Sequence, residues 1–249
     1  MIDLLKEIIL DFQEINLPTG VLRRVDVTPV PGKATVCIGV RRGGKSTFMF
    51  QLIQRLQDTG VPRQNILYLN FFDDRLHNLQ HSGLSVILEA YFSLYPEKKH
   101  TEKIYCFFDE IQIVSDWEPF VDRLMRTEKC EVYITGSSAQ MLSKEIATQM
   151  RGRALSWEMF PFSFPEFLDF KGIERDGALS TKKRLTVQKA FDDYWETGGF
   201  PEVAGLDRTL RLKIHQEYFN AMLFRDIVER HDIPHPKAVT DLAHWLVDN

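Results

Sequence analysis

The sequence predicts an α/β fold in the first two thirds of the chain and a small all-helical region after it. Short apolar, β-branched runs alternate with segments whose apolar residues recur at helical spacing, which is typical of a parallel sheet covered by helices. A glycine-rich turn joins the first apolar run, Ala34–Ile38, to the helical pattern that follows it. From Phe164 onward only helical spacing remains.

Composition limits the classes of protein to which the chain can belong. It has 249 residues, 44% hydrophobic and 27% charged, which is ordinary for a soluble protein with a sizeable core. The net charge of −4 argues against a general attraction to nucleic acid, although a local basic face stays open. The 3 cysteines are too few and too scattered for a disulfide framework. With no signal peptide and no apolar run near the ~20 residues of a membrane span, we expect a cytoplasmic protein with no membrane partner.

The core elements are expected in a regular order. An N-terminal helix runs to about Ile15, and Arg23 and Arg24 follow it. We interpret these arginines as solvated surface residues, with a flank of an adenine pocket as the alternative. The strands are expected at residues 34–38, 66–71, 104–108, 131–135 and 155–160, and the helices between them at 48–60, 84–95, 117–125 and 141–150.

The helical region begins after a predicted hinge at residues 161–167. Its helices are expected at 185–195, 206–227 and 238–247, and a basic run at 182–184 is expected to be a solvated helix start. We divide the chain into an N-terminal helix plus core at 1–165, a helical lid at 166–235 and the start of a truncated C-terminal region at 236–249. The last boundary reflects a helical pattern that reaches Asn249 without a capping signal.

The glycine-rich turn carries the strongest chemical signal. Its sequence, Gly39-Val40-Arg41-Arg42-Gly43-Gly44-Lys45-Ser46-Thr47, fits the phosphate-binding pattern G-x-x-x-x-G-K-[ST] between a strand and a helix. Glycines let backbone N–H groups approach phosphate oxygens, and the N-terminus of the helix adds partial positive charge. An ordinary glycine-rich turn is the alternative. The residues expected to bind a nucleotide are Gly39, Arg42, Gly43, Gly44, Lys45, Ser46 and Thr47, with Lys45 on the β- and γ-phosphates and Ser46 on Mg²⁺.

Acidic residues at strand ends complete the predicted site. Asp109 and Glu110 follow a strongly apolar run, so Asp109 is expected to hold Mg²⁺ and Glu110 to activate the attacking water. The alternative is a strand that simply ends in acids. Lys45 and Asp109 are 64 residues apart, a separation that suggests an extra strand between the loop strand and the acid strand, namely 131–135. Asp73 and Asp74 are read as turn or cap residues, with Mg²⁺ contact as the less favoured alternative.

Polar residues after the extra strand are candidates for sensing the phosphate. The hydroxyl of Ser137 or Ser138 is expected to lie between the γ-phosphate and the acid pair, with turn capping as the alternative. Arg151 and Arg153 are candidate arginine fingers that would act in cis or in trans, and a structural salt bridge is the alternative.

Several motifs in order suggest a family. They are Gly39–Thr47, Phe107-Phe108-Asp109-Glu110-Ile111-Gln112, Asp116-Trp117-Glu118, Thr135-Gly136-Ser137-Ser138-Ala139, Gly152-Arg153, the segment 161–167 and Gly198-Gly199-Phe200-Pro201-Glu202. Over residues 20–235 the chain resembles prokaryotic AAA-type P-loop ATPases of the archaeal-type, STAND-like branch, which carry a C-terminal domain of unknown function.

The resemblance implies a P-loop NTPase core of the AAA type with an additional strand between the Walker A and Walker B strands, followed by a helical lid. It also implies a winged-helix or nuclease-like C-terminal region that this chain lacks. Analogy with related STAND ATPases places Pro201 near the adenine or ribose. Gly43 departs from the family pattern, which usually has a larger residue there, and it is expected to loosen the loop while leaving the phosphate-binding geometry intact.

Together these features predict a slow, Mg²⁺-dependent ATPase that acts as a nucleotide-driven conformational switch. One alternative is a nucleic-acid-associated regulator in which ATP binding rather than turnover is the signal. A small-molecule or nucleoside kinase is less favoured, because such enzymes need an acceptor pocket but no acid pair followed by a sensor strand. A protein or DNA partner would act through the missing C-terminal domain, and an oligomer stays open.

Overall fold

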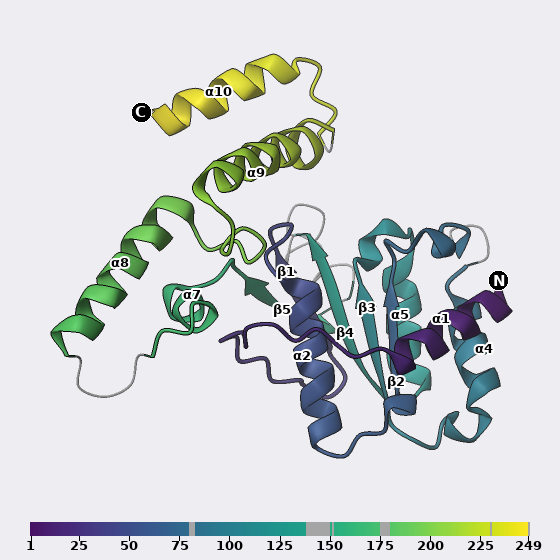
Figure 1. Ribbon diagram of the computed structural model, residues 1–249. Coiled ribbons are helices and arrows are strands. Elements are labelled where there is room, and N and C mark those ends of the chain that lie inside the picture. Colours follow the sequence, from purple (N-terminus) through teal and green to yellow (C-terminus); the bar gives the residue numbers. More distant parts are fainter. Residues whose placement is uncertain (80–82, 138–149, 151, 175–179, 230, 249) are drawn as a thin grey trace. The chain divides into compact units, whose positions relative to one another are not determined.

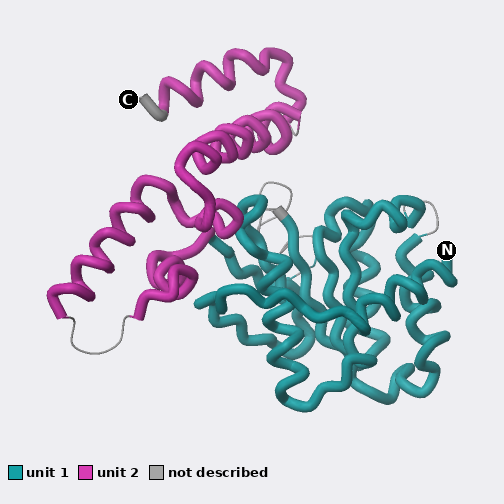
Figure 2. The backbone as a smooth tube through the Cα atoms, in the orientation of Figure 1, with its two compact units in different colours: residues 1–160 teal, residues 161–249 magenta. Residues whose placement is uncertain are grey.

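The computed structural model describes the whole chain except residues 80–82, 138–149, 151, 175–179, 230 and 249 (Figure 1). The chain divides into two compact units, residues 1–160 and residues 161–249 (Figure 2). Among the described residues, no helix is both long enough and apolar enough to cross a membrane.

The first unit is built around a five-stranded sheet with the order β2-β3-β4-β1-β5. All four strand pairings are parallel. The additional strand, β4, lies between β1, which enters the glycine-rich turn, and β3, which ends at Asp109. The predicted fold class and the predicted place of the extra strand are therefore confirmed. The strands are β1 (Ala34–Gly39), β2 (Ile66–Asn70), β3 (Ile104–Asp109), β4 (Cys130–Ser137) and β5 (Ala154–Met159).

Helices connect these strands much as the apolar spacing predicts. The α-helices of the first unit are α1 (Ile2–Glu14), α2 (Lys45–Asp58), α4 (Ser85–Leu94) and α5 (Trp117–Thr127). Short 3₁₀ turns are found at Arg63–Asn65, Asp74–Leu76, Pro96–Lys98 and Ile111–Ile113. The helix predicted over 141–150 lies outside the described residues apart from Met150.

Alternate residues of each strand join different hydrophobic clusters, as a sheet covered on both faces requires. In β1, Val36 and Ile38 belong to the cluster that contains residues of α4 and α5, whereas Cys37 packs with Phe48 and Met49 of α2. Asp109 follows Phe108 in β3, so its side chain lies on the α2 face of the sheet, the face that also carries Tyr68.

The N-terminal helix α1 lies along the β2 edge of the sheet, next to α4 (Figure 1). Leu5, Ile8 and Ile9 join the cluster on the α4 side, and Phe12 joins the cluster on the α2 side. Helix α1 thus contributes to both cores. An edge strand exposes unpaired backbone groups, so covering it with a helix protects the sheet from pairing with other chains.

The second unit is helical in its described residues, and it contains one helix that the sequence patterns did not lead us to expect. Helix α7 begins inside the segment predicted as a hinge, because Ser163 and Glu166 form a capping box at its N-terminus. The pattern Ser-x-x-Glu was visible in the sequence. The helices are α7 (Phe164–Phe170), α8 (Thr181–Thr197), α9 (Arg208–Ala221), the π-helical segment Met222–Glu229 and α10 (Pro236–Asp248).

Candidate nucleotide-binding site

Backbone constraints at two glycines shape the turn between β1 and α2. A Cβ atom on Gly39 would lie 2.1 Å from the carbonyl oxygen of Met159 in β5, so only glycine fits beside that strand. Gly44 has φ 94°, a left-handed conformation that side chains disfavour, and it immediately precedes α2. The turn therefore holds its backbone close to the start of the helix, as a phosphate cradle requires.

Lys45 is the first residue of α2 and is only 4% exposed. Its Nζ donates hydrogen bonds to the carbonyl oxygens of Gly39 and Val40, at 3.2 and 3.0 Å. The same nitrogen lies 3.7 Å from Oε1 of Glu110. Burial lowers the pKa of Lys45, and the carboxylates of Glu110 and Asp109 oppose that shift. Structure and sequence thus agree that Lys45 and the acid pair meet.

Asp109 is completely buried at the end of β3. Its Oδ2 accepts a hydrogen bond of 2.9 Å from the hydroxyl of Tyr68, and its Oδ1 accepts one from the hydroxyl of Thr135. Burial, with the nearby carboxylate of Asp109, raises the pKa of Tyr68 far above its usual range, so the phenol keeps its proton. Two hydroxyl donors therefore hold the carboxylate in one orientation.

Glu110 follows Asp109 in a left-handed conformation, with φ 57°. Its N–H donates to the hydroxyl oxygen of Thr135 at 3.1 Å. Its Oε2 accepts a 2.5 Å hydrogen bond from Nε2 of Gln112. The side chain of Glu110 is thus held between an amide donor and the ammonium of Lys45.

Three contacts of the acid pair were not anticipated from the sequence: those of Tyr68, Thr135 and Gln112. Thr135 offers a signal, because it is a hydroxyl residue that directly follows the apolar run 132–134. Gln112 lies two residues beyond Glu110 and offers a weaker one. The contact of Tyr68 depends on its pairing with Phe107 across the sheet, and that register cannot be read from either strand alone.

Arg23 corrects one sequence interpretation, because it is 5% exposed rather than solvated. Its guanidinium donates to the carbonyl oxygens of Gly43 and Phe160, at 2.7 and 2.5 Å. Its backbone N–H donates to Oε1 of Gln51 in α2 at 3.0 Å. Arg23 therefore holds the glycine-rich turn in place through its hydrogen bond to Gly43. Arg24 is exposed as expected.

Gly43 is held on both sides. Its N–H donates to the carbonyl oxygen of Val40 at 3.2 Å, and its own carbonyl oxygen accepts from Arg23. A Cβ atom at this position would lie 3.1 Å from the carbonyl oxygen of Val40. These contacts give Gly43 a defined position in the turn.

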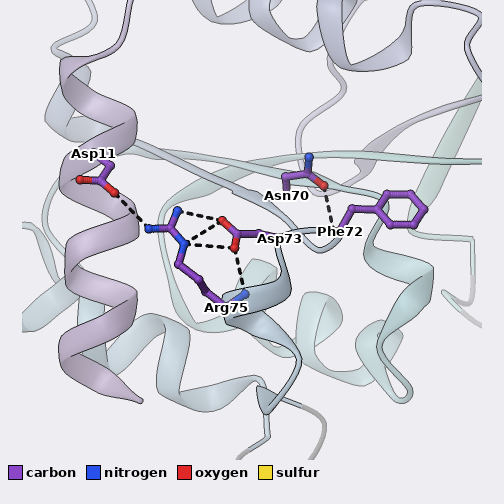
Figure 3. A network of polar contacts seen from close by, with 5 residues as sticks. All are labelled: Asp11, Asn70, Phe72, Asp73 and Arg75. Atoms are coloured by element: carbon purple, nitrogen blue, oxygen red, sulfur yellow. Dashed lines mark hydrogen bonds and ion pairs between the residues drawn. The ribbon is translucent and has the colours of Figure 1, made fainter.

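Asp73 caps a turn, which confirms the favoured interpretation of this acid. Its side chain accepts a hydrogen bond of 3.0 Å from the N–H of Arg75 and pairs with the guanidinium of Arg75 at 2.8 Å (Figure 3). Arg75 also reaches Asp11 of α1 at 3.2 Å. Hydrogen bonding from Arg75 lowers the pKa of Asp73. Nearby, Asn70 accepts from the N–H of Phe72 at 2.9 Å.

The structure describes only some of the residues proposed as phosphate sensors or arginine fingers. Ser137 ends β4 and pairs in register with Gly39, so its backbone lies beside the start of the loop. Ser138 and Arg151 lie outside the described residues. Arg153 forms an ion pair of 2.7 Å with Asp122 of α5, the kind of contact weighed as its alternative. Pro201 belongs to the second unit.

The residues at this edge of the sheet fit nucleotide phosphates and Mg²⁺. A Cβ atom on Gly39 would clash with the backbone of Met159, so glycine keeps this part of the turn open. Gly44 turns the backbone into the N-terminus of α2. Oxygen ligands suit Mg²⁺, and the carboxylate of Asp109 and the hydroxyl of Ser46 are of that kind. Lys45 adds a cation between the loop and the acid pair.

Comparison with known proteins identifies the family. The profile of the AAA domain family matches residues 31–168. The uncharacterized protein MJ1544 of Methanocaldococcus jannaschii is 38% identical over 247 residues, which cover 98% of this chain and 53% of that protein. An uncharacterized protein of Haemophilus influenzae is 33% identical over 216 residues, which cover 86% of this chain and 51% of that protein. The chain thus spans about half the length of these relatives.

Solved structures with a related arrangement include PCH-2 of C. elegans, with a TM-score of 0.48 and 13% identity over 84% of this chain and 60% of that chain. AMPPCP-bound DnaA from Aquifex aeolicus has a TM-score of 0.43 and 13% identity over 90% of this chain and 64% of that chain. The family profile covers the loop, the acid pair and all five strands of the sheet. The chain therefore belongs to the AAA domain family.

Proposed function

We propose that this chain binds ATP with Mg²⁺ and hydrolyses it slowly to ADP and phosphate. One observation carries the proposal: Lys45 of the loop and Glu110 of the acid strand meet at 3.7 Å across the additional strand β4. Thr135 of β4 contacts both Asp109 and Glu110. A kinase reaction would use the loop and the metal but would not need this acid pair with its own support.

The loop would hold the phosphates. The backbone from Gly39 to Thr47 would supply N–H donors, and Lys45 would contact the β- and γ-phosphates. Arg23 supports this role, because its hydrogen bond to the carbonyl oxygen of Gly43 helps to hold the turn in one conformation. Binding energy at the loop would orient the terminal phosphate toward the acid pair.

Asp109 and Ser46 would hold Mg²⁺. The metal, when bound, supplies positive charge that offsets the charge developing on the phosphate oxygens. The chain's own contribution is a carboxylate that is held from both sides, by Tyr68 and Thr135, so that little reorganisation is needed.

Glu110 would take the proton of the attacking water. Its contact with Gln112 holds one carboxylate oxygen, and the other faces Lys45. A carboxylate in this position can orient a water molecule and accept its proton as the bond to phosphorus forms. Among the remaining roles, Ser137 would sense the γ-phosphate, Arg153 would stabilise charge after leaving Asp122, and Pro201 would lie near the adenine or ribose.

Hydrolysis would act as a conformational switch between the two compact units, 1–160 and 161–249. The division of the chain into these units supports the idea, because each has its own internal packing. The second unit would serve as a lid, and a protein or DNA partner would respond to its movement. A distance between dye labels, one in each unit, should change between ATP and ADP if this switch operates.

The decisive experiment compares phosphate release by the parent chain and by Glu110→Gln. The amide keeps the shape of the side chain but cannot accept a proton, so turnover should fall about 10²-fold or more while ATP binding persists. Glu89→Gln, an exposed change on α4, is the matched control and should leave the rate unchanged. Equal rates for the parent and Glu110→Gln would refute the role of Glu110.

A further inference from the structure

Tyr68 is a buried polar side chain on the edge strand β2 that contacts the acid pair. It is 9% exposed, and its hydroxyl donates to Oδ2 of Asp109 at 2.9 Å across 41 residues of sequence. Strand β2 takes no part in the glycine-rich loop and lies at the opposite side of the sheet from β5. Tyr68 therefore connects an outer strand to the proposed metal ligand.

The two oxygens of Asp109 have different donors. Oδ1 accepts from Thr135, whose hydroxyl oxygen in turn accepts the N–H of Glu110. The hydroxyl of Thr135 has a single proton, and Thr135 donates it to Asp109. Tyr68 supplies the donor to Oδ2, so together with Thr135 it fixes the rotation of the carboxylate about its last bond. Without that hydroxyl, Oδ2 would lose a hydrogen bond inside the protein.

The ring of Tyr68 is itself fixed by aromatic contacts. Phe12 of α1 stacks on it with ring centroids 4.6 Å apart and an interplanar angle of 22°. Phe50 of α2 packs against it at 5.3 Å. Arg63 lies over the ring of Phe12 at 4.2 Å and donates to the carbonyl oxygen of Phe12 at 2.8 Å. The C-terminal end of α1 is thus held in place against Tyr68.

We propose that Tyr68 is a positioning residue that orients Asp109 for Mg²⁺, and that Phe12 of helix α1 sets the position of Tyr68. The inference rests on the proposed role of Asp109 as a metal ligand. Groups that hold a metal ligand in place set its geometry, and their loss weakens metal binding although they never touch the metal. Helix α1 thereby takes part in the nucleotide site without contacting the nucleotide.

The test measures metal binding directly rather than turnover. Mn²⁺ replaces Mg²⁺, and its electron paramagnetic resonance signal reports the affinity of Mn²⁺ for the chain with a non-hydrolysable ATP analogue. Tyr68→Phe removes only the hydroxyl and should weaken Mn²⁺ binding roughly tenfold. The affinity for the analogue in EDTA should stay unchanged, because the loop and Lys45 are intact.

Tyr133→Phe is the matched control. Tyr133 is 3% exposed, lies on β4 and donates its hydroxyl to Oε2 of Glu131 at 2.9 Å, so the substitution removes another hydrogen bond from a tyrosine to a carboxylate, at a partly buried position. It should leave Mn²⁺ affinity at the parent value. Phe12→Leu keeps the hydroxyl but removes the stacking ring, and it should also weaken Mn²⁺ binding. This variant carries the test if circular dichroism shows that Tyr68→Phe does not fold.

Parent-like Mn²⁺ affinity in both Tyr68→Phe and Phe12→Leu would overturn the proposal. An equal loss of analogue affinity in EDTA would overturn it too, because Tyr68 would then support the whole site rather than orient Asp109. A parent chain that binds the analogue but no Mn²⁺ would instead overturn the proposed metal site itself. That outcome is distinct from equal metal affinities in parent and variants.

Discussion

The ammonium nitrogen of Lys45 lies 3.7 Å from Oε1 of Glu110, although β1 and β3, the strands that lead to these residues, are not neighbours. Strand β4 separates them, and its Thr135 contacts the acid pair. The two side chains are 4% and 15% exposed. This ion pair therefore joins the two halves of the candidate site across the additional strand.

Replacing Lys45 should remove the response to nucleotide. A ligand present at 100 times its Kd stabilises a folded protein by about 2.7 kcal/mol, so the parent should melt at a higher temperature with Mg²⁺ and ATP. Lys45→Ala should lose this shift, because the cation for the β- and γ-phosphates is gone. Lys103→Ala, an exposed change at the far end of β3, should keep it. A full shift in Lys45→Ala would contradict the role of Lys45.

The lowered pKa of Lys45 should make the free energy of unfolding depend on pH. Between the depressed folded pKa and its ordinary value of 10.5, the unfolded chain binds more protons than the folded chain. Stability should therefore rise with pH across that window. The other lysines and the tyrosines titrate in both the parent and Lys45→Met, so the difference between their urea midpoints isolates Lys45. A difference that stays constant up to pH 10 would count against the lowered pKa.

Arg23 should matter for both stability and the loop. Arg23→Ala leaves the buried carbonyl of Gly43 without this donor, which should lower the free energy of unfolding by about 2 kcal/mol in urea titrations. Nucleotide affinity should fall as well, because the turn loses the hydrogen bond that holds Gly43 in place. Arg55→Ala changes an exposed arginine of α2 and should do neither. Parent-like values for Arg23→Ala would show that the turn holds its shape without this arginine.

Asp73 should contribute to the stability of its turn and not to Mg²⁺ binding. Asp73→Asn weakens the pairing with Arg75, which is 39% exposed, so the stability loss should stay below about 1 kcal/mol. The pKa of Asp73 is lowered from 3.8, so its contribution should be present above that value and lost as pH falls through the folded pKa. The Mg²⁺ requirement of ATP binding should match the parent. A shifted Mg²⁺ requirement would instead support a contact between Asp73 and Mg²⁺.

Local patterns predicted most of the elements and the loop correctly. Strands, helices and the phosphate-binding pattern are encoded by residues within about ten positions of each other, so periodicity and motif spacing detect them. The place of the extra strand came from the resemblance to AAA-type ATPases, because the gap between Lys45 and Asp109 holds β2 while β4 follows Asp109 in the sequence. A separate helix at Phe164 was not predicted, although its capping box was visible within the segment that we interpreted as a hinge.

The sequence by itself therefore determined the separate strands, the loop and the acid pair, since each depends on short-range chemistry. Only the tertiary structure decided which side chains support them. Arg23 reaches Phe160 across 137 residues, and Tyr68 reaches Asp109 across 41. Contacts of this kind follow from strand register and from the packing of α1 and α2. Register depends on the whole sheet, so a residue pattern within one segment cannot reveal it.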